Sequence, residues 1–413
     1  MLPYGFLSYG GPMAHIGMLE QTFVEKLKWI SPQQFSELFA LCQSFPGPTS
    51  TQMIIALGSM ATQSALGGML AFAIFAVPAA TVLLIAGLVF RYIMNLEQQE
   101  NFEMPEHVGY ALQGFQSAAI AIVAQAAWKL GYKANQQPIH LMIIFLSAAI
   151  YLLFSYSVTM FILMGAGCFF NIFLEKDLKK KNNTQLLDEQ TSQEQNNDII
   201  REGRPPFGKI SLIVFVCTLL FLILANLLIS VEQVQYSAKF FYLGSIIVGG
   251  GHVILPLMLQ NFQAYGLVDT IYWNGFSIVS ALPGPLFNIS IYVGAIIDGV
   301  RGAILGWVFL FAPAFMMIWG ILPFWDRYRN KQTIQKGLRG VSCVSIGFIL
   351  SAVYSLYVSA GEQDQTTTTL IAIGSYVALH VYECRAPLVI LCGGILMVCR
   401  QVVLVQYRGL PSN

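Results

Sequence analysis

The sequence predicts an all-α polytopic membrane protein made of two homologous helical repeats in inverted topology, with helices broken at Pro-Gly-Pro (PGP) motifs. Three observations support this fold class: few charges, a series of uncharged helical stretches, and similarity between the two halves. Of 413 residues, 56% are hydrophobic and 10% are charged, against about 25% charged in an ordinary soluble domain. Positive and negative side chains nearly cancel, so no nucleic-acid partner is indicated.

Uncharged stretches long enough to cross a bilayer recur along the chain. Residues 210–231 contain no charged side chain, and a helix of about 20 apolar residues spans the hydrocarbon core. Further membrane segments are expected at 35–60, 68–94, 108–130, 240–262, 273–297, 302–325 and 336–357. Residues 139–174 and 367–404 suit tight helical hairpins that turn near 155–157 and 383–387. With an opening segment before Lys26, these make about a dozen membrane segments.

A polar stretch rich in Asn, Gln and charges of both signs separates the two halves. Such a stretch cannot bury enough apolar surface to fold, so we expect a solvated cytoplasmic linker, with a regulatory tail as the alternative. The predicted organisation is a first repeat at 1–174, the linker at 175–208, a connecting transmembrane helix at 209–232 and a second repeat at 233–413.

Four blocks of sequence recur in the same order in the two halves. The stretch FALCQSFPGPTSTQMIIALG (39–58) resembles FSIVSALPGPLFNISIYVG (276–294). Residues 67–79 resemble 301–314, residues 110–131 resemble 336–357, and the Gly-Gly pair at 10–11 corresponds to the Gly-Gly-Gly run at 249–251. The shared order indicates an internal duplication.

Charges in equivalent loops predict that the two repeats are inverted. The loop 95–107 contains four Glu and no Lys or Arg, whereas the loop 326–339 contains five Lys or Arg. Because basic short loops stay in the cytoplasm, these two loops are expected on opposite sides, and the extra helix 210–231 provides the inversion. Lys26 and Lys28 do not fit this assignment, which would be explained if 35–60 does not cross as a simple span.

Each repeat has a PGP motif inside an otherwise uncharged helical stretch, at Pro46-Gly47-Pro48 and Pro283-Gly284-Pro285. Two prolines remove two backbone donors, and the glycine between them permits unusual dihedral angles. Backbone opened at membrane depth must be lined by protein or a water-filled cavity, and the half-helix that follows begins with free N–H groups that suit an anion. The alternative is a kink that serves only helix packing. Candidate side-chain donors that follow the motifs are Thr49, Ser50, Gln52 and Asn288.

Glycine clusters close to a histidine are the second candidate feature, and they comprise Gly10, Gly11 and His15, and Gly249, Gly250, Gly251 and His252. Glycines let helices approach closely, so packing alone explains them equally well, whereas an intramembrane histidine favours a functional role. Glu20 and Glu37 flank the first PGP in sequence. They could carry protons, or they could face water at segment ends.

Several function classes lack sequence support. The chain has no GxxxxGK[ST] loop, no HExxH or GxSxG motif and no Cys/His ligand spacing. We therefore expect neither ATP-driven transport nor an enzyme, and no metal or other cofactor. The chain start also lacks the basic n-region and cleavage site of a signal peptide.

The segments GGPMAHIGMLEQTFVEKLKWIS (10–31) and FPGPTSTQ (45–52) resemble the opening signature of the chromate ion transporter (CHR) family. GGGHVILPLM (249–258) with ALPGPLFN (281–288) resembles the second-half counterpart in the long, two-domain form. The opening helix is shorter and the linker longer than the family pattern. The resemblance implies efflux of chromate, an oxyanion shaped like sulfate, and its signature positions are Gly10, Gly11, Pro12, His15, Pro46, Gly47, Pro48, Gly249, Gly250, Gly251, Pro283, Gly284 and Pro285.

Inverted repeats with broken helices are the architecture of secondary transporters, whose sites lie near the midplane between the repeats. We therefore expect a multi-pass protein of the cell membrane that exports chromate or a sulfate-like oxyanion by alternating access. A passive anion channel of the same fold and a non-transporting scaffold are the alternatives. The expected partners are the oxyanion, a coupling ion for which a proton is one candidate, and the lipid bilayer, with a homodimer as an open alternative.

Overall fold

The computed structural model describes residues 5, 11–45, 47–100, 106–134, 137–154, 157–174, 208–247, 254–322, 331–361 and 364–408. Every regular element in these ranges is a helix, which confirms the predicted all-α class. The elements before the predicted linker are α2 (Gly11–Glu20), the π-helical turn η1 (Gln21–Lys26), α3 (Pro32–Ser44), α4 (Thr49–Thr62), α5 (Ala65–Glu100), α6 (Glu106–Ala134), α7 (Pro138–Leu153) and α8 (Ser157–Leu174).

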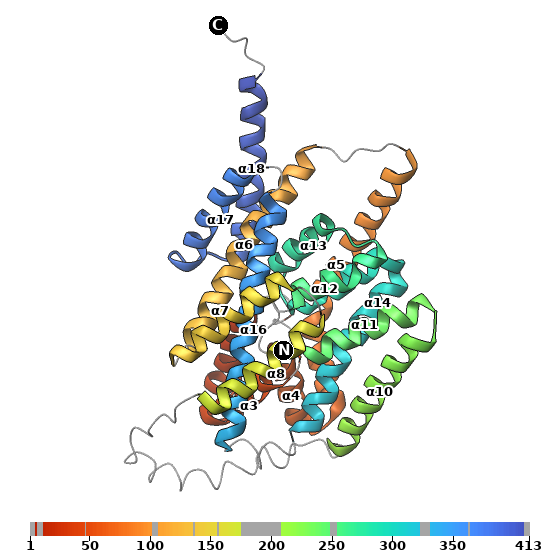
Figure 1. The fold of residues 1–413 in the computed structure, drawn as a ribbon, viewed down its shortest axis with the longest axis vertical. Helices are drawn as coiled ribbons and strands as arrows, with labels where there is room; N and C mark the ends of the chain where they lie inside the picture. The colour runs from red at the N-terminus through yellow and green to blue at the C-terminus, as the bar shows by residue number, and fades with distance from the viewer. Residues whose placement is uncertain are drawn as a thin grey trace.

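The second half of the chain has a similar series of helices, which two further helices precede among the described residues (Figure 1). The predicted linker, 175–208, lies outside the described residues except for Gly208. The elements are α10 (Gly208–Leu228), α11 (Glu232–Ile246), α12 (Ile254–Phe262), the short 3₁₀ turn η3 (Gln263–Tyr265), α13 (Asp269–Ala281), the 3₁₀ turn η4 (Leu286–Asn288), α14 (Ile289–Ile321), α16 (Gln332–Gly361), α17 (Gln365–His380) and α18 (Ala386–Arg408).

Length, composition and exposure place this fold in a membrane. Five described segments are long and apolar enough to cross a bilayer: Ala65–Leu96, Gly208–Ala225, Leu286–Ile321, Arg339–Val358 and Ala386–Val403. Large apolar side chains on their outer faces are exposed, such as Ile213 (62%) and Phe221 (63%) on α10. A contiguous exposed apolar surface of this kind is unfavourable in water but matches lipid. The chain is therefore an integral, multi-pass membrane protein.

A helical hairpin follows each PGP motif, and its turn has a left-handed backbone in both halves. The first hairpin is α4 and α5, joined at Gln63, whose φ is +52°. The second lies inside α14, whose backbone leaves helical geometry at Asp298 (φ −140°) and Gly299 (φ +59°) and so divides it into two arms. The long arms carry Pro78 and Pro313 at corresponding places. The two halves thus share a local design as well as a sequence pattern.

Two long helices cross at the centre of the molecule, α5 from the first half and α14 from the second. The ring of Phe72 on α5 stacks on Trp307 at 5.2 Å between centroids and contacts Phe311 at 4.8 Å. Further along α5, Gly87 lies against Ala295 in the other arm of α14. Because a glycine has no side chain, the helix backbones approach closely at that point. The contact between α5 and α14 is therefore part of the interface between the two halves.

The remaining helices interlock between the halves. The equivalent helices α6 and α16 run antiparallel, since Gln113 near the start of α6 donates to the carbonyl of Ala360 near the end of α16 (3.0 Å). The hairpin α7–α8 packs on α16, and the hairpin α17–α18 packs on α6, so each hairpin lies on the long helix of the other half (Figure 1). Glycines let the helices approach closely in both places. Gly114 of α6 meets Gly393 of α18, and Gly340 of α16 meets Gly167 of α8.

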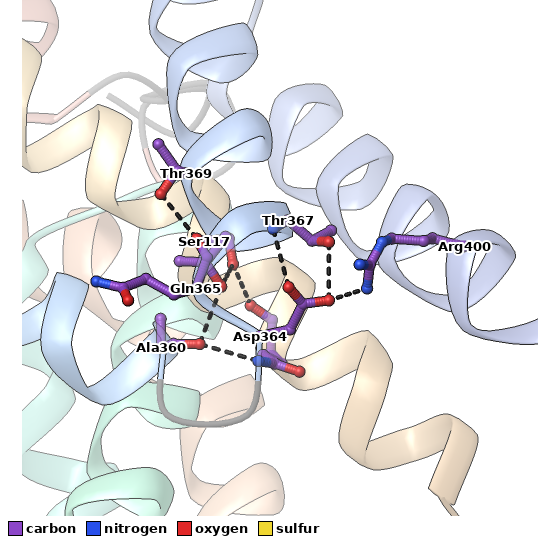
Figure 2. Close-up of polar contacts among 9 residues, drawn as sticks. Ser117, Ala360, Asp364, Gln365, Thr367, Thr369 and Arg400 are labelled. Carbon is purple, nitrogen blue, oxygen red and sulfur yellow. Dashed lines mark hydrogen bonds and ion pairs between the residues drawn. The ribbon is translucent and has the colours of Figure 1, made fainter. Parts of the chain in front are cut away.

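The start of α17 is fixed by the side chain of Asp364, as Figure 2 shows. Its Oδ1 accepts a hydrogen bond from the main-chain N–H of Thr367 (3.1 Å), and its Oδ2 accepts one from the Thr367 hydroxyl (2.8 Å). This N-cap satisfies a donor that the helix leaves without an intrahelical partner. Arg400 of α18 forms an ion pair with the same carboxylate. The cap therefore also ties the two helices of the hairpin together.

Both hairpins predicted from the sequence are confirmed. α7 ends at Leu153 and α8 begins at Ser157, while α17 ends at His380 and α18 begins at Ala386. The predicted segment 35–60 is two helices, α3 and α4, which meet at the PGP motif. The orientation of the repeats relative to the bilayer stays a prediction.

Candidate functional site

The first PGP motif joins α3 to α4 and breaks the helix, as predicted. α3 ends at Ser44, and Phe45 has an extended backbone (φ −118°, ψ 157°). Gly47 has a φ of +124°, which side chains rarely tolerate and glycine adopts without cost. Pro48, which is also extended, is the N-cap residue of α4, where its fixed φ and missing N–H are harmless. Pro46 lies outside the described residues.

The second PGP motif has the same backbone course between α13 and α14. Leu282 is extended (φ −91°, ψ 152°) after α13, and Gly284 has a φ of +110°. Pro283 and Pro285 are buried. Here the 3₁₀ turn η4 intervenes before α14, and Pro285 is its N-cap residue. Both motifs therefore produce a broken helix with a positive-φ glycine at its centre.

Each PGP motif packs against the opposite half of the chain. The N–H of Gly47 donates to the carbonyl of Ile247 at the end of α11 (2.7 Å), and a β-carbon added to Gly47 would lie 3.2 Å from Cβ of Ala314. A β-carbon added to Gly284 would lie 3.1 Å from the carbonyl oxygen of Phe75. The two motifs thus lie in the interface between the repeats.

The start of α4 is a buried, polar helix N-terminus. Thr49, Ser50 and Gln52 expose 6%, 3% and 1% of their surface, and Thr51 exposes none. The first N–H groups of any α-helix lack intrahelical acceptors, and no side chain caps α4. The positive end of the helix dipole therefore lies in a buried setting, where it is screened least. Such an end suits an anion.

The predicted donors Gln52 and Asn288 both fold back over their PGP glycine. Nε2 of Gln52 lies 2.5 Å from the position of a β-carbon on Gly47, and Nδ2 of Asn288 lies 3.9 Å from that on Gly284. Asn288, fully buried, donates from Nδ2 to the carbonyl of Ala76 (2.8 Å) and accepts at Oδ1 from Nε1 of Trp307 (3.0 Å). Its amide is therefore engaged on both sides by the protein itself.

His15 on α2 is buried at 2% exposure, and its ring meets the Phe75 ring edge-on at 5.2 Å. Because Phe75 also lies against Gly284, the structure brings His15 into the neighbourhood of the second PGP motif. Gly11 is the first residue of α2. The other predicted members of the glycine–histidine clusters, Gly10, Gly249, Gly250, Gly251 and His252, lie outside the described residues.

The structure describes the side chain of one of the two candidate proton carriers, Glu20, but not that of Glu37. Glu20 ends α2 with an exposed side chain. Glu37 belongs to α3, and its side chain lies outside the described part of the structure. Within the described ranges, no group of three or more His, Cys, Asp or Glu side chains comes together as a metal site would require.

Sequence reasoning did not single out Thr51 or Trp307. Thr51 stands in a run of four polar residues, and its position alone does not distinguish it from its neighbours. Trp307 lies in sequence 19 residues after Asn288, its hydrogen-bond partner, and no local pattern predicts that contact. The only available signal was the alignment of the repeats, which places Thr51 and Asn288 at the same third position after their PGP motifs.

A multi-pass bundle with two broken helices, each with its break at the interface between the halves, defines a membrane protein of the transporter class. A family model described as "Chromate transporter" matches residues 1–171 and 234–398. The chain therefore belongs to the chromate transporter family, as the sequence motifs predicted.

Curated relatives of the chain are distant but match it over most of its length. An uncharacterised transporter of Methanocaldococcus jannaschii is 26% identical over 85% of this chain and 81% of its own. The chromate transport protein of Pseudomonas aeruginosa is 26% identical over 90% and 83%. The chromate transport protein of Cupriavidus metallidurans is 23% identical over 86% and 80%. No solved structure matches the chain significantly.

Proposed function

We propose that this protein is a secondary transporter that exports chromate or a sulfate-like oxyanion across the cell membrane by alternating access. The observation that carries the proposal is the buried N-terminus of α4 at the first PGP motif, in the interface between the halves. A dianion there would meet main-chain N–H groups and the positive end of a helix dipole. No Lys or Arg occurs between residues 45 and 62, so binding would be dipolar.

The substrate class is supported by the relatives. Two of them are named chromate transport proteins, and chromate and sulfate are tetrahedral dianions with four acceptor oxygens. Export is the direction that the family resemblance implies. The proposed site residues are those of the two PGP segments, together with those of the glycine–histidine clusters.

Alternating access needs two halves that can exchange roles. The antiparallel course of the equivalent helices α6 and α16 is what an inverted repeat would produce. In inverted-repeat transporters, one repeat moves against the other around a central site. A coupling ion would drive the cycle, with a proton as the first candidate and Glu20 as an accessible carboxylate.

The test is flux in proteoliposomes of the purified protein, with radiolabelled chromate and sulfate and with imposed pH and voltage gradients. We expect accumulation of the oxyanion above its equilibrium distribution, and collapse of that accumulation when an ionophore removes the driving gradient. Flux that only equilibrates the anion would instead indicate a passive channel. Absence of any flux from correctly folded protein would indicate a scaffold.

A further inference from the structure

Several buried hydroxyl groups in the helices of this protein donate to the carbonyl four residues earlier. Ser117 donates to Gln113 (2.8 Å), Ser245 to Phe241 (2.7 Å) and Ser277 to Trp273 (2.9 Å). Thr51 differs from them. Its side chain is fully buried, and Oγ1 has no hydrogen-bond partner in the described part of the chain. A buried polar group without a partner is costly, so this hydroxyl requires an explanation.

The break in the helix explains why Thr51 lacks the usual acceptor. The residue four positions earlier is Gly47, whose φ of +124° places it outside the helix. Side chains of a helix lean toward its N-terminus. The hydroxyl of Thr51, in the first turn of the 14-residue helix α4, therefore lies toward the N–H groups that have no acceptor. An anion at this helix end could accept hydrogen bonds from both kinds of donor.

The equivalent position in the other half is occupied differently. Thr51 is the third residue after Pro48, and Asn288 is the third residue after Pro285. The amide of Asn288 is engaged by Ala76 and Trp307. Its main-chain N–H also donates to the carbonyl of Pro285 (3.0 Å), which closes η4. At the third position after the second PGP motif, the side chain and the main-chain N–H therefore both have hydrogen-bond partners within the protein. At the equivalent position after the first motif, the Thr51 hydroxyl has none among the described residues.

We propose that the hydroxyl of Thr51 donates a hydrogen bond to the transported tetrahedral oxyanion. The first PGP segment then binds the anion, and the second segment, which is fixed through Asn288, positions the anion. This inference rests on the proposed function, and it assigns unequal roles to the two halves of the protein. The alternative is a symmetric site, in which Asn288 would have to leave Ala76 and Trp307 to reach the anion.

Ser290 provides a matched control within the same chain. It is the second residue of α14, is fully buried, and also has a hydroxyl without a partner among the described residues. Its main-chain carbonyl, however, lies 2.9 Å from the position of a β-carbon on Gly306, where the two arms of α14 cross. It also follows the closed turn η4. We expect its hydroxyl to have no part in binding.

The experiment compares Thr51→Val, Thr51→Ser and Ser290→Ala in proteoliposomes, with KM for chromate uptake and thermal unfolding measured for each. Hydrogen bonds to charged groups are stronger than neutral ones, so Thr51→Val should raise KM about tenfold or more. Its melting temperature without substrate should be equal or higher, because the substitution removes a buried unpaired hydroxyl. Thr51→Ser, which keeps the hydroxyl, should have a KM close to wild type, as should Ser290→Ala.

An unchanged KM in Thr51→Val would overturn the inference while leaving the proposed function in place. So would an equal rise of KM in Ser290→Ala, or a failure of Thr51→Ser to restore affinity. If Thr51→Val does not fold, the smaller Thr51→Ala takes its place and must show the same rise. Wild-type protein that moves neither chromate nor sulfate would instead refute the proposed function itself, and the role of Thr51 with it.

Discussion

The side-chain amide of Gln52 lies over the α-carbon of Gly47, with Nε2 2.5 Å from the position that a β-carbon would take. The turn and the helix that follows it are thus packed against each other through a space that only glycine leaves free. The positive φ of Gly47 adds a second constraint, because a side chain is strained in that conformation whatever room it has. Gly47 is therefore a sensitive position for testing the first PGP segment.

Replacement of Gly47 by alanine should abolish oxyanion transport and lower the free energy of unfolding by about 1–3 kcal/mol through backbone strain. The new β-carbon would also displace the Gln52 amide from the start of α4. Flux per folded molecule and thermal unfolding would be measured together. Gly17→Ala is the control, since that glycine lies in α2 with no atom near its added β-carbon. Normal flux in Gly47→Ala would remove this segment from the site.

Asn288→Leu should destabilise the protein by about 2–5 kcal/mol, because it removes two buried hydrogen bonds, to the carbonyl of Ala76 and from the indole N–H of Trp307, and leaves that N–H without its acceptor. Trp307→Phe should cost less, since it keeps an aromatic ring against Phe72 and removes only one of the two hydrogen bonds. Chemical or thermal unfolding in detergent measures both. A melting temperature equal to wild type in Asn288→Leu would show that this amide does not anchor the second PGP segment.

Asp364→Ala should destabilise the α17–α18 hairpin by about 1 kcal/mol, the usual cost of losing an N-cap. Figure 2 shows why Asp364→Asn should be milder: an amide oxygen can still accept from the Thr367 N–H. Arg400→Gln should cost under about 1 kcal/mol, since Arg400 is 37% exposed and exposed ion pairs contribute little. Thermal unfolding of the three variants measures the order of their losses in stability. A larger loss in Arg400→Gln than in Asp364→Ala would contradict this assignment.

The interlocked hairpins predict that neither half is stable alone. Chains cut in the polar segment, as residues 1–190 and 191–413, should co-purify through a tag on one fragment when they are expressed together. The reason is that α7 and α8 need α16, and α17 and α18 need α6. Each fragment expressed by itself should aggregate or be degraded. A monodisperse single fragment with helical circular dichroism would be inconsistent with this packing.

The inverted topology predicts that residues 95–107 and 326–339 face opposite sides of the membrane. Single cysteines placed in each range, in a chain whose seven native cysteines are replaced, can be labelled with an impermeant thiol reagent in intact cells. Only the cysteine in 95–107 should react before the membrane is permeabilised. Equal labelling of both from outside would refute the inversion.

The features that the sequence predicted well are those with local causes. Two prolines around a glycine break a helix wherever they occur, so both breaks were predictable, as were the hairpins of α7–α8 and α17–α18 from their length. The sequence alone predicts that replacement of Gly47 or Gly284 by leucine abolishes oxyanion transport but leaves a folded protein. The φ values of +124° and +110° make alanine the better test, because any side chain is strained there.

The features that were not predictable depend on contacts between distant segments. An amide such as that of Asn288 can donate to a ligand or to a carbonyl, and only the approach of Ala76 and Trp307 decides which. The placement of each hairpin on the long helix of the other half has no counterpart in any local pattern. Thr51 is distinguished from Thr49 and Ser50 by complete burial of a hydroxyl that lacks a partner among the described residues, which composition cannot indicate.

The most direct measurement is a structure of the purified full-length protein with saturating chromate. Density for a tetrahedral anion is expected at the N-terminal end of α4, within hydrogen-bond distance of the Thr51 hydroxyl and of main-chain N–H groups in the first turn. Anion density elsewhere in the molecule, with the start of α4 unoccupied, would contradict the account.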